Sequence, residues 1–228
     1  SAIGGANVLN MAPWVAQIFL GQGVAMILIT VNIGQLTAQV NASDCMLDFI
    51  NNYFMLASIY ISLAIEASGL LHSVYLVQIA FAKLSGTPVN SNEPPRAGVK
   101  LALFWGRVVM SLGILGFALA VQLDALFKGW TNMWAAVPAG AAIPIVFLLL
   151  GFVGIMEGMQ IAAFAVVKQD ESEYRDTHKI AHANCQLLFK GKNLGRFLIG
   201  RQLLVCASMF VAARIFSINS GHPEVSPP

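Results

Sequence analysis

Residues 143–167 have the sequence IPIVFLLLGFVGIMEGMQIAAFAVV, an apolar run interrupted by one carboxylate and one amide. A membrane-spanning helix needs about 20 mainly apolar residues, and this run is long enough. A charged side chain within a span costs about 2.5–3.5 kcal/mol on insertion scales, and such residues usually face a bundle interior or a water-filled cavity. Glu157 and Gln160 are three residues apart and share one face of a helix. The stretch therefore predicts a membrane helix with a polar face.

A second ionisable residue, Arg201, also lies within an apolar segment and is followed by Gln202. Consecutive residues point about 100° apart on a regular helix, so both reach one cavity only if Gly200 loosens the helix or the cavity wraps around it. One interpretation is a structural ion pair between Glu157 and Arg201. Such a pair leaves the two amides unexplained, and we therefore favour a substrate site formed by these residues and Gln160.

The composition excludes an ordinary soluble domain. Of the 228 residues, 57% are hydrophobic and 11% are charged, whereas soluble domains carry about 25% charged residues. The net charge of +2 gives no reason to expect a nucleic-acid partner, and the three cysteines have neither metal-site spacing nor an even disulfide framework. The first residue is Ser1 and the last residues are polar and rich in proline. The sequence predicts an integral membrane protein and an internal fragment of a longer chain.

Five apolar segments predict an all-α, polytopic membrane bundle in which residues 1–228 form a single transmembrane domain. The expected helices are residues 12–38, 48–83, 99–127, 135–167 and 194–218. The second segment is too long for one perpendicular span, so we expect it to tilt, to extend beyond the bilayer, or to break near Gly69.

Basic residues gather in two of the connections between these segments. Cytoplasmic connections carry an excess of Lys and Arg, so the second and fourth connections are predicted to be cytoplasmic. The residues concerned are Lys83, Arg96, Lys100, Lys168, Arg175, Lys179, Lys190 and Lys192.

Glycines on the fourth segment suggest where a neighbouring helix would pack. Gly154 and Gly158 have the small-xxx-small spacing that lets two helix backbones approach closely, and Gly151 extends the stripe. We expect a packing seam there, beside the polar face.

Three short motifs occur in order along the chain. They are Cys45-Met46-Leu47-Asp48, Glu157-Gly158-Met159-Gln160 and Gly200-Arg201-Gln202. In these motifs the sequence resembles the diatom silicon transporters, which carry paired Glu-Gly-x-Gln and Gly-Arg-Gln signatures. The Cys-Met-Leu-Asp motif is associated with pennate-type members, and the likeness covers the whole chain. The family has the motif pair twice, so the resemblance implies a partial chain; Gly106-Arg107-Val108 departs from the signature and is not counted as a copy.

The resemblance implies uptake of silicic acid through the plasma membrane, coupled to sodium, with no cofactor and no enzymatic reaction. It also implies that the two motifs bind the substrate, so that Gly158 and Gly200 belong to the site beside Glu157, Gln160 and the Arg201-Gln202 pair. The expected partners are silicic acid and the lipid bilayer, and a homo-oligomer is compatible with the sequence.

The chemistry of the motif residues suits this substrate. Silicic acid is a small, neutral, tetrahedral molecule with four hydroxyl groups that donate and accept hydrogen bonds. A carboxylate accepts, an amide does both, and a guanidinium donates in a planar fork. A phosphate site would be more cationic and often lies at a helix N-terminus.

Two further groups are candidate site residues. Glu66, Ser68 and His72 form a polar cluster in the second segment, and an acidic residue in a span is a candidate for lining the pathway. Cys45 and Asp48 would share a helix face and could offer two ligands to a metal such as zinc, although zinc normally takes four. The alternative for Asp48 is a simple helix-start residue, favoured by the helix dipole.

Two other classes of function are alternatives to a coupled transporter. An intramembrane enzyme would use Glu157 or His72 as an acid or base, but the chain has no His-Glu-x-x-His, Gly-x-Ser-x-Gly or paired-aspartate motif. A passive channel for small neutral solutes, or a structural membrane bundle, is the remaining alternative.

Overall fold

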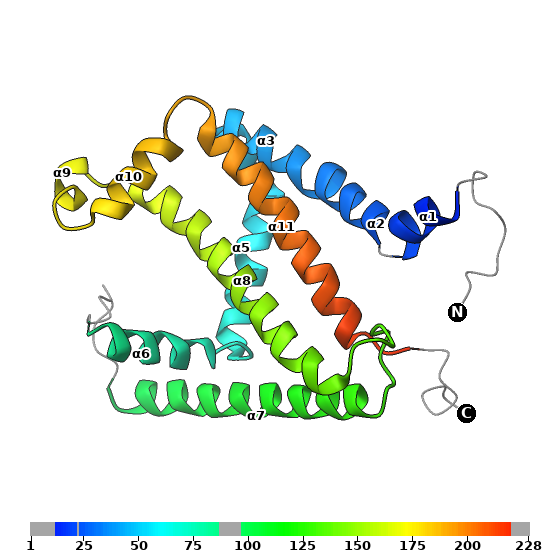
Figure 1. The fold of residues 1–228 in the computed structure, drawn as a ribbon. Coiled ribbons are helices and arrows are strands. Elements are labelled where there is room, and N and C mark those ends of the chain that lie inside the picture. The colour runs from blue at the N-terminus through cyan, green and yellow to red at the C-terminus, as the bar shows by residue number, and fades with distance from the viewer. Residues whose placement is uncertain (1–11, 22, 87–96, 220–228) are drawn as a thin grey trace. The chain divides into compact units, whose positions relative to one another are not determined.

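The computed structural model describes residues 12–21, 23–86 and 97–219, most of which are helical (Figure 1). Within these ranges, β-type pairing is confined to an isolated bridge between Thr131 and Ile218. The predicted all-α membrane fold is confirmed.

Four described helices are long and apolar enough to cross a membrane. They span residues 24–42, 99–127, 139–166 and 193–216. The chain divides into two compact units, residues 1–46 with 129–228 and residues 47–128, and each unit is described by itself.

A break divides the first apolar segment of the larger unit. Before it lie α1 (Pro13–Ala16) and η2 (Gln17–Gly21), and after it come α2 (Val24–Ile29), η3 (Thr30–Leu36) and α3 (Thr37–Asp44). Gly23 has a φ of +74°, and a Cβ built there would lie 2.0 Å from the Phe210 ring. Only glycine combines this backbone conformation with such a close approach. The prediction of one continuous helix over residues 12–38 is therefore wrong.

Arg214 holds this break in place. Its Nη1 donates a hydrogen bond of 2.6 Å to the carbonyl of Gly21, the last residue of η2. The guanidinium also lies 4.7 Å from the centre of the Trp134 ring, a favourable cation–π distance. The carbonyl that the break exposes is thus satisfied by a side chain from the end of α11 (Asn193–Phe216).

Helices α8 (Ala139–Val166) and α11 run antiparallel and pack against each other (Figure 1). Their buried and half-buried positions recur with alternating spacings of four and three, the pattern of coiled-coil-like helix pairs. On α8 these positions are Ala142, Val146, Leu149, Val153, Met156, Gln160 and Ala163, and on α11 they are Arg201, Val205, Ser208, Ala212 and Ile215.

The connection between α8 and α11 contains two short helices, α9 (Glu171–Tyr174) and α10 (Lys179–Leu188). Nε2 of His182 lies 2.5 Å from a carboxylate oxygen of Glu171. This hydrogen bond lowers the pKa of Glu171 below its ordinary value. The contact ties α9 to the outer side of α10.

The ends of the long helices agree closely with prediction, with one exception. Helix α7 is Val99–Phe127 as expected, and α11 differs from the predicted 194–218 by one or two residues at each end. Helix α8 starts at Ala139 and not at residue 135. Pro138 takes an extended conformation at the N-cap, and the residue before a proline is itself disfavoured from the helical region.

The smaller unit contains α5 (Tyr53–Ser68), α6 (Val74–Ser85) and α7, after the short helix α4 (Met46–Ile50) that begins at its boundary. Gly69 ends α5 with a φ of +79°, and a Cβ there would lie 2.6 Å from Arg107.

A serine from α7 bridges this break. The buried Ser111 hydroxyl donates to the Leu70 carbonyl at 2.6 Å and accepts from the Ser73 amide at 3.1 Å. Of the three alternatives for the long second segment, the structure has the break near Gly69, and the shorter helices α5 and α6 follow the end of α4 in place of one span.

Candidate functional site

The centre of the candidate site is an ion pair between α8 and α11. Nη1 of Arg201 lies 3.0 Å from a carboxylate oxygen of Glu157, and the Arg201 side chain is 1% exposed while that of Glu157 is 48% exposed. Arg201 is eight residues from the start of α11, roughly 12 Å along the helix axis. Arg201 therefore lies about two turns inside an apolar helix that is long enough to cross a membrane.

The Arg201 guanidinium has donors that the described residues leave unused. Its Nη2 donates to Gln202 at 2.7 Å. Its Nε and Nη1 are buried without a hydrogen-bond partner, because Nη1 faces Glu157 at ion-pair distance without hydrogen-bond alignment. Buried donors without an acceptor cost about 1–3 kcal/mol each. The guanidinium is therefore only partly satisfied by the described residues.

Gln202 faces a different helix from Arg201. Its Nε2 donates to Gln35 at 2.5 Å, and its Oε1 accepts a bond of 3.2 Å from Gln39. Gln35 also accepts a 2.8 Å hydrogen bond from the thiol of Cys206. The amide is buried, and its hydrogen bonds join η3 and α3 to α11.

The polar side chains consequently form a belt around α11, which consists of Glu157, Arg201, Gln202, Gln35 and Gln39. Arg201 and Gln202 point to different neighbours, as consecutive helical residues must, and the guanidinium reaches back to the Gln202 carbonyl. Because α11 is helical from Asn193 to Phe216, Gly200 does not interrupt it. Of the two arrangements that would let both residues face one cavity, a helix loosened at Gly200 is therefore excluded, and a cavity that wraps around the helix stays a prediction.

Gln160 forms no hydrogen bond to a residue of the belt. It lies among the half-buried positions of α8 that pack against α11, one turn from Glu157. Of the four polar side chains predicted to converge, the structure brings Glu157, Arg201 and Gln202 together and leaves Gln160 beside them.

A groove opens next to this belt. It has a volume of about 410 Å³, and Gln39, which is bonded to Gln202, forms part of its wall. The other lining residues are Leu36, Val40, Lys192, Gly195, Arg196, Leu198 and Ile199. The groove thus provides space between α11 and the helix that carries the two additional glutamines.

The glycines of the motifs are not packing positions within the described chain. A Cβ built on Gly158 or Gly200 would meet no other group within 4 Å, and the same holds for Gly151 and Gly154. The expected close packing along the glycine seam is therefore absent from the described residues. The seam instead leaves open space beside Glu157.

Three residues outside the sequence motifs are bonded to the candidate site: Gln35, Gln39 and Cys206. Gln35 and Gln39 are four residues apart within an apolar segment, a spacing that places both amides on one helix face. This spacing is the feature of the sequence that could have predicted a second pair of amides facing the site. Gln35 also belongs to the π-helical turn η3, and π-helical turns inside helices often occur at functional sites.

The second predicted cluster lies in the smaller unit, where the break at Gly69 forms a pocket of about 300 Å³. Glu66, His72 and Tyr75 line it, and Nε2 of His72 is 3.7 Å from the Glu66 carboxylate. His72 is 5% exposed. Ser68 is not part of this pocket wall, because its hydroxyl donates to the Ile65 carbonyl of its own helix.

The proposed metal ligands do not lie on one helix. Cys45 is the residue between α3 and α4, whereas Asp48 is inside α4, so the assumed helical spacing is wrong. Among the described residues, no three His, Cys, Asp or Glu side chains gather closely enough to hold a metal ion. Zinc binding by Cys45 and Asp48 gains no support from the structure.

Comparison with known proteins gives a family but no individual relative. No curated protein and no solved structure matches the chain. The family model described as silicon transporter matches residues 1–224. The match spans both motif stretches and the four long apolar helices. The chain therefore belongs to the silicon transporter family, whose members are membrane transporters of silicon.

Proposed function

We propose that this chain carries silicic acid through the plasma membrane, coupled to sodium, and that Glu157, Arg201 and Gln202 bind the substrate. The observation that carries the proposal is the Arg201 guanidinium, which is buried within the apolar helix α11 with two nitrogens lacking hydrogen-bond acceptors. A transported hydroxyl oxygen is an acceptor of the right size for this position. Silicic acid brings four such oxygens, each also carrying a proton.

The belt offers a complementary set of groups to this substrate. The Glu157 carboxylate accepts hydrogen bonds, the guanidinium donates them, and the amide of Gln202 does both. Nearly half of the Glu157 side chain remains uncovered, which leaves the carboxylate accessible. The opposite charges of Glu157 and Arg201 cancel, as suits a neutral substrate better than a phosphate.

Binding would proceed by exchange of hydrogen bonds within the belt. Gln202 uses its carbonyl for Arg201 and Gln39 and its amino group for Gln35. Each substrate hydroxyl can take over one of these bonds, so the substrate replaces amide partners at little loss of hydrogen bonding. Gln35 and Gln39 are then part of the same site, and the groove beside Gln39 provides a route to it.

Sodium coupling and a role for Glu157-Gly158-Met159-Gln160 in binding are supported by the resemblance of the motifs. The oxygen-bearing residues of the smaller unit do not single out an ion site. Asn52, for example, caps α5 by accepting from the Met55 amide, and Ser58 donates to the Phe54 carbonyl.

The test is uptake of labelled silicic acid, or of its germanium analogue, into vesicles that contain the protein. We expect Gln202→Leu and Gln160→Leu to be produced normally and to transport slowly, by about tenfold for each 1.4 kcal/mol of binding free energy lost. Gln78→Leu is the matched control, because it removes an exposed amide from the apolar helix α6 outside the belt.

Each alternative has its own outcome in this assay. If Gln202→Leu takes up silicic acid at the parent rate, the belt is not part of the binding site. An uptake rate that is independent of the sodium gradient and does not saturate with silicic acid concentration would indicate a passive channel. Absence of uptake by a folded parent protein would indicate a structural bundle.

A further inference from the structure

The hydrogen bonds that join the amides of the belt run in one direction from Arg201. Nη2 of Arg201 donates to Oε1 of Gln202 at 2.7 Å, and Nε2 of Gln202 donates in turn to Oε1 of Gln35 at 2.5 Å. A guanidinium has donors only, so the Gln202 oxygen is the amide atom that must face it. Arg201 therefore fixes which atom of the Gln202 amide, and through it which atom of the Gln35 amide, takes part in the chain of bonds.

Cys206 supplies a second donor at the far end of this chain. Its thiol donates to the same Oε1 of Gln35 at 2.8 Å, from a position one turn after Gln202 on α11. Its Sγ also lies 3.8 Å from Nε2 of Gln202. In a reversed Gln35 amide, Nε2 would face the amino group of Gln202, and the thiol proton would lose its acceptor. The thiol thus favours one of the two orientations of the Gln35 amide.

The direction of the chain decides which atoms the two outer amides leave for a ligand. Among the described residues, Nε2 of Gln35 has no acceptor. Gln39 uses its Nε2 on Gln202, so its Oε1 is the amide atom without a described partner. Gln39 also lines the groove beside the belt. The outer amides therefore offer one donor and one acceptor, and a hydroxyl group can match either of them.

We propose that Cys206 is a positioning residue of the substrate site, which keeps the Gln35 amide turned so that its amino group stays available to a hydroxyl oxygen of the substrate. This role rests on the proposed function, because it presupposes that the belt binds the substrate. Cys206 acts through Gln35 and not by touching the substrate. The alternative for a half-buried cysteine in an apolar helix is simple packing, which does not depend on the thiol proton.

The test measures equilibrium binding of labelled germanic acid to the purified full chain, and uptake of the same compound into vesicles. Cys206→Val removes the donor at similar side-chain size. A neutral hydrogen bond changes an equilibrium constant by about two- to tenfold, and a thiol is a weak donor, so we expect binding to weaken about threefold. In the uptake assay KM should rise by the same factor while the maximal rate stays near the parent value.

Two further substitutions at this position separate the hydrogen bond from packing. Cys206→Ser keeps a donor and should bind germanic acid at least as tightly as the parent, which a packing role does not predict. Cys206→Ala removes the donor without adding volume, so it should weaken binding as Cys206→Val does even if valine disturbs the helix contacts.

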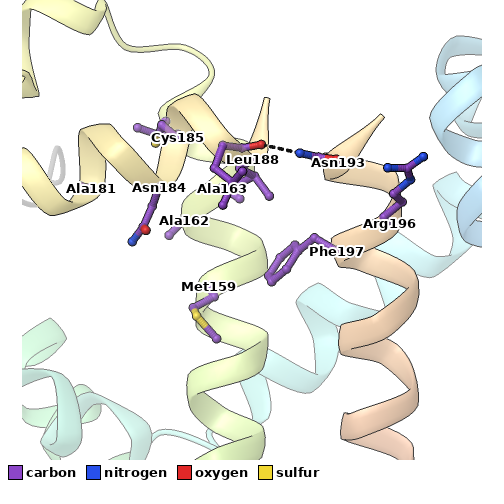
Figure 2. Close-up of a pocket in the computed structure, with 12 residues that line it drawn as sticks. Met159, Ala162, Ala163, Ala181, Asn184, Cys185, Leu188, Asn193, Arg196 and Phe197 are labelled. Carbon is purple, nitrogen blue, oxygen red and sulfur yellow. Dashed lines mark hydrogen bonds between the residues drawn. The ribbon is translucent and has the colours of Figure 1, made fainter. Parts of the chain in front are cut away.

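Cys185→Val is the matched control. Cys185 is also a free, half-buried cysteine. It lines a different part of the larger unit, an apolar cavity of about 720 Å³ whose walls come from α8, α10 and α11 (Figure 2). Since Cys185 is not part of the belt, its substitution should leave germanic acid binding at the parent value.

A double-mutant cycle shows whether the thiol acts through Gln35. Gln35→Met removes the amide that Cys206 is proposed to orient. Once this amide is absent, Cys206→Val should have no further effect, so the two substitutions together should weaken binding no more than Gln35→Met alone.

Three results would each overturn the positioning role. They are parent-like binding by Cys206→Val, failure of Cys206→Ser to restore binding, and an equal loss from Cys206→Val with and without the Gln35 amide. Failure of the proposed function has a different signature. If Gln202→Leu and Gln35→Met both bind germanic acid as the parent does, the substrate site lies elsewhere, and a parent that binds no germanic acid would overturn both proposals. A parent that binds germanic acid but does not carry it into vesicles would contradict transport alone.

Discussion

Removing the charge of Glu157 should destabilise the protein by stranding Arg201. Glu157→Gln keeps the size of the side chain and removes the carboxylate that lies 3.0 Å from Nη1 of Arg201. The guanidinium is 1% exposed, and two of its nitrogens already lack hydrogen-bond acceptors. No other acidic side chain among the described residues forms an ion pair with it.

The size of the effect follows from burial. Breaking a fully buried ion pair by removing one partner costs about 3–5 kcal/mol. Since the Glu157 side chain is 48% exposed, part of its charge is screened, and we expect about 2–3 kcal/mol. In a chain of this length each kcal/mol lowers the unfolding temperature by about 2–4 °C, so the fall should be about 4–12 °C.

Thermal unfolding of the purified chain, followed by circular dichroism, measures this fall. Glu171→Gln is the matched control, because Glu171 pairs with His182, whose side chain is 17% exposed, whereas that of Arg201 is 1% exposed. Surface pairs contribute about 0–1 kcal/mol, so this variant should unfold within a few degrees of the parent.

The double variant Glu157→Gln with Arg201→Met separates structure from transport. Removing both charges eliminates the stranded guanidinium and should recover most of the lost stability. Silicic acid uptake should stay low, because the groups that bind the substrate are gone. An unfolding temperature of Glu157→Gln equal to that of the parent would refute the reasoning, and parent-rate uptake by a stable double variant would leave the pair a structural role only.

Three further predictions concern the guanidinium of Arg201, the helix break at Gly23 and the exposed thiol of Cys45. Arg201→Lys keeps the charge but loses the planar fork, so uptake should fall at least tenfold while unfolding temperature changes little; parent-like uptake would exclude recognition by two guanidinium nitrogens. Gly23→Ala should destabilise the chain by about 2–4 kcal/mol in thermal unfolding, because of its positive φ and the 2.0 Å approach to Phe210, whereas Gly113→Ala in open space should not. Cys45 is exposed and follows a segment without Lys or Arg, so an impermeant thiol reagent should label it on sealed cells; labelling only after permeabilisation would reverse the predicted orientation.

The sequence alone determined the membrane fold and the two charged positions. Apolar length predicted α7, α8 and α11, because every backbone polar group in lipid must be bonded within a helix. The high cost of a charge in lipid made Glu157 and Arg201 candidate site residues, and the structure pairs their side chains. The segment around Gly69 is too long for one perpendicular span, which left tilt, extension beyond the bilayer or a break as alternatives; the structure has the break, where Gly69 takes a positive φ.

Tertiary structure decided which partners these residues have. Helical periodicity states that Arg201 and Gln202 point apart, but it does not state which helix lies opposite each of them. Gln35 is 167 residues away from Gln202 in the sequence, and only the packing of η3 and α3 against α11 brings the two amides together. The break at Gly23 likewise depends on Phe210, which occupies the space where a Cβ would lie. The residues of a segment determine the free-energy cost of burying it. Contacts between distant segments determine which groups form hydrogen bonds with its polar atoms.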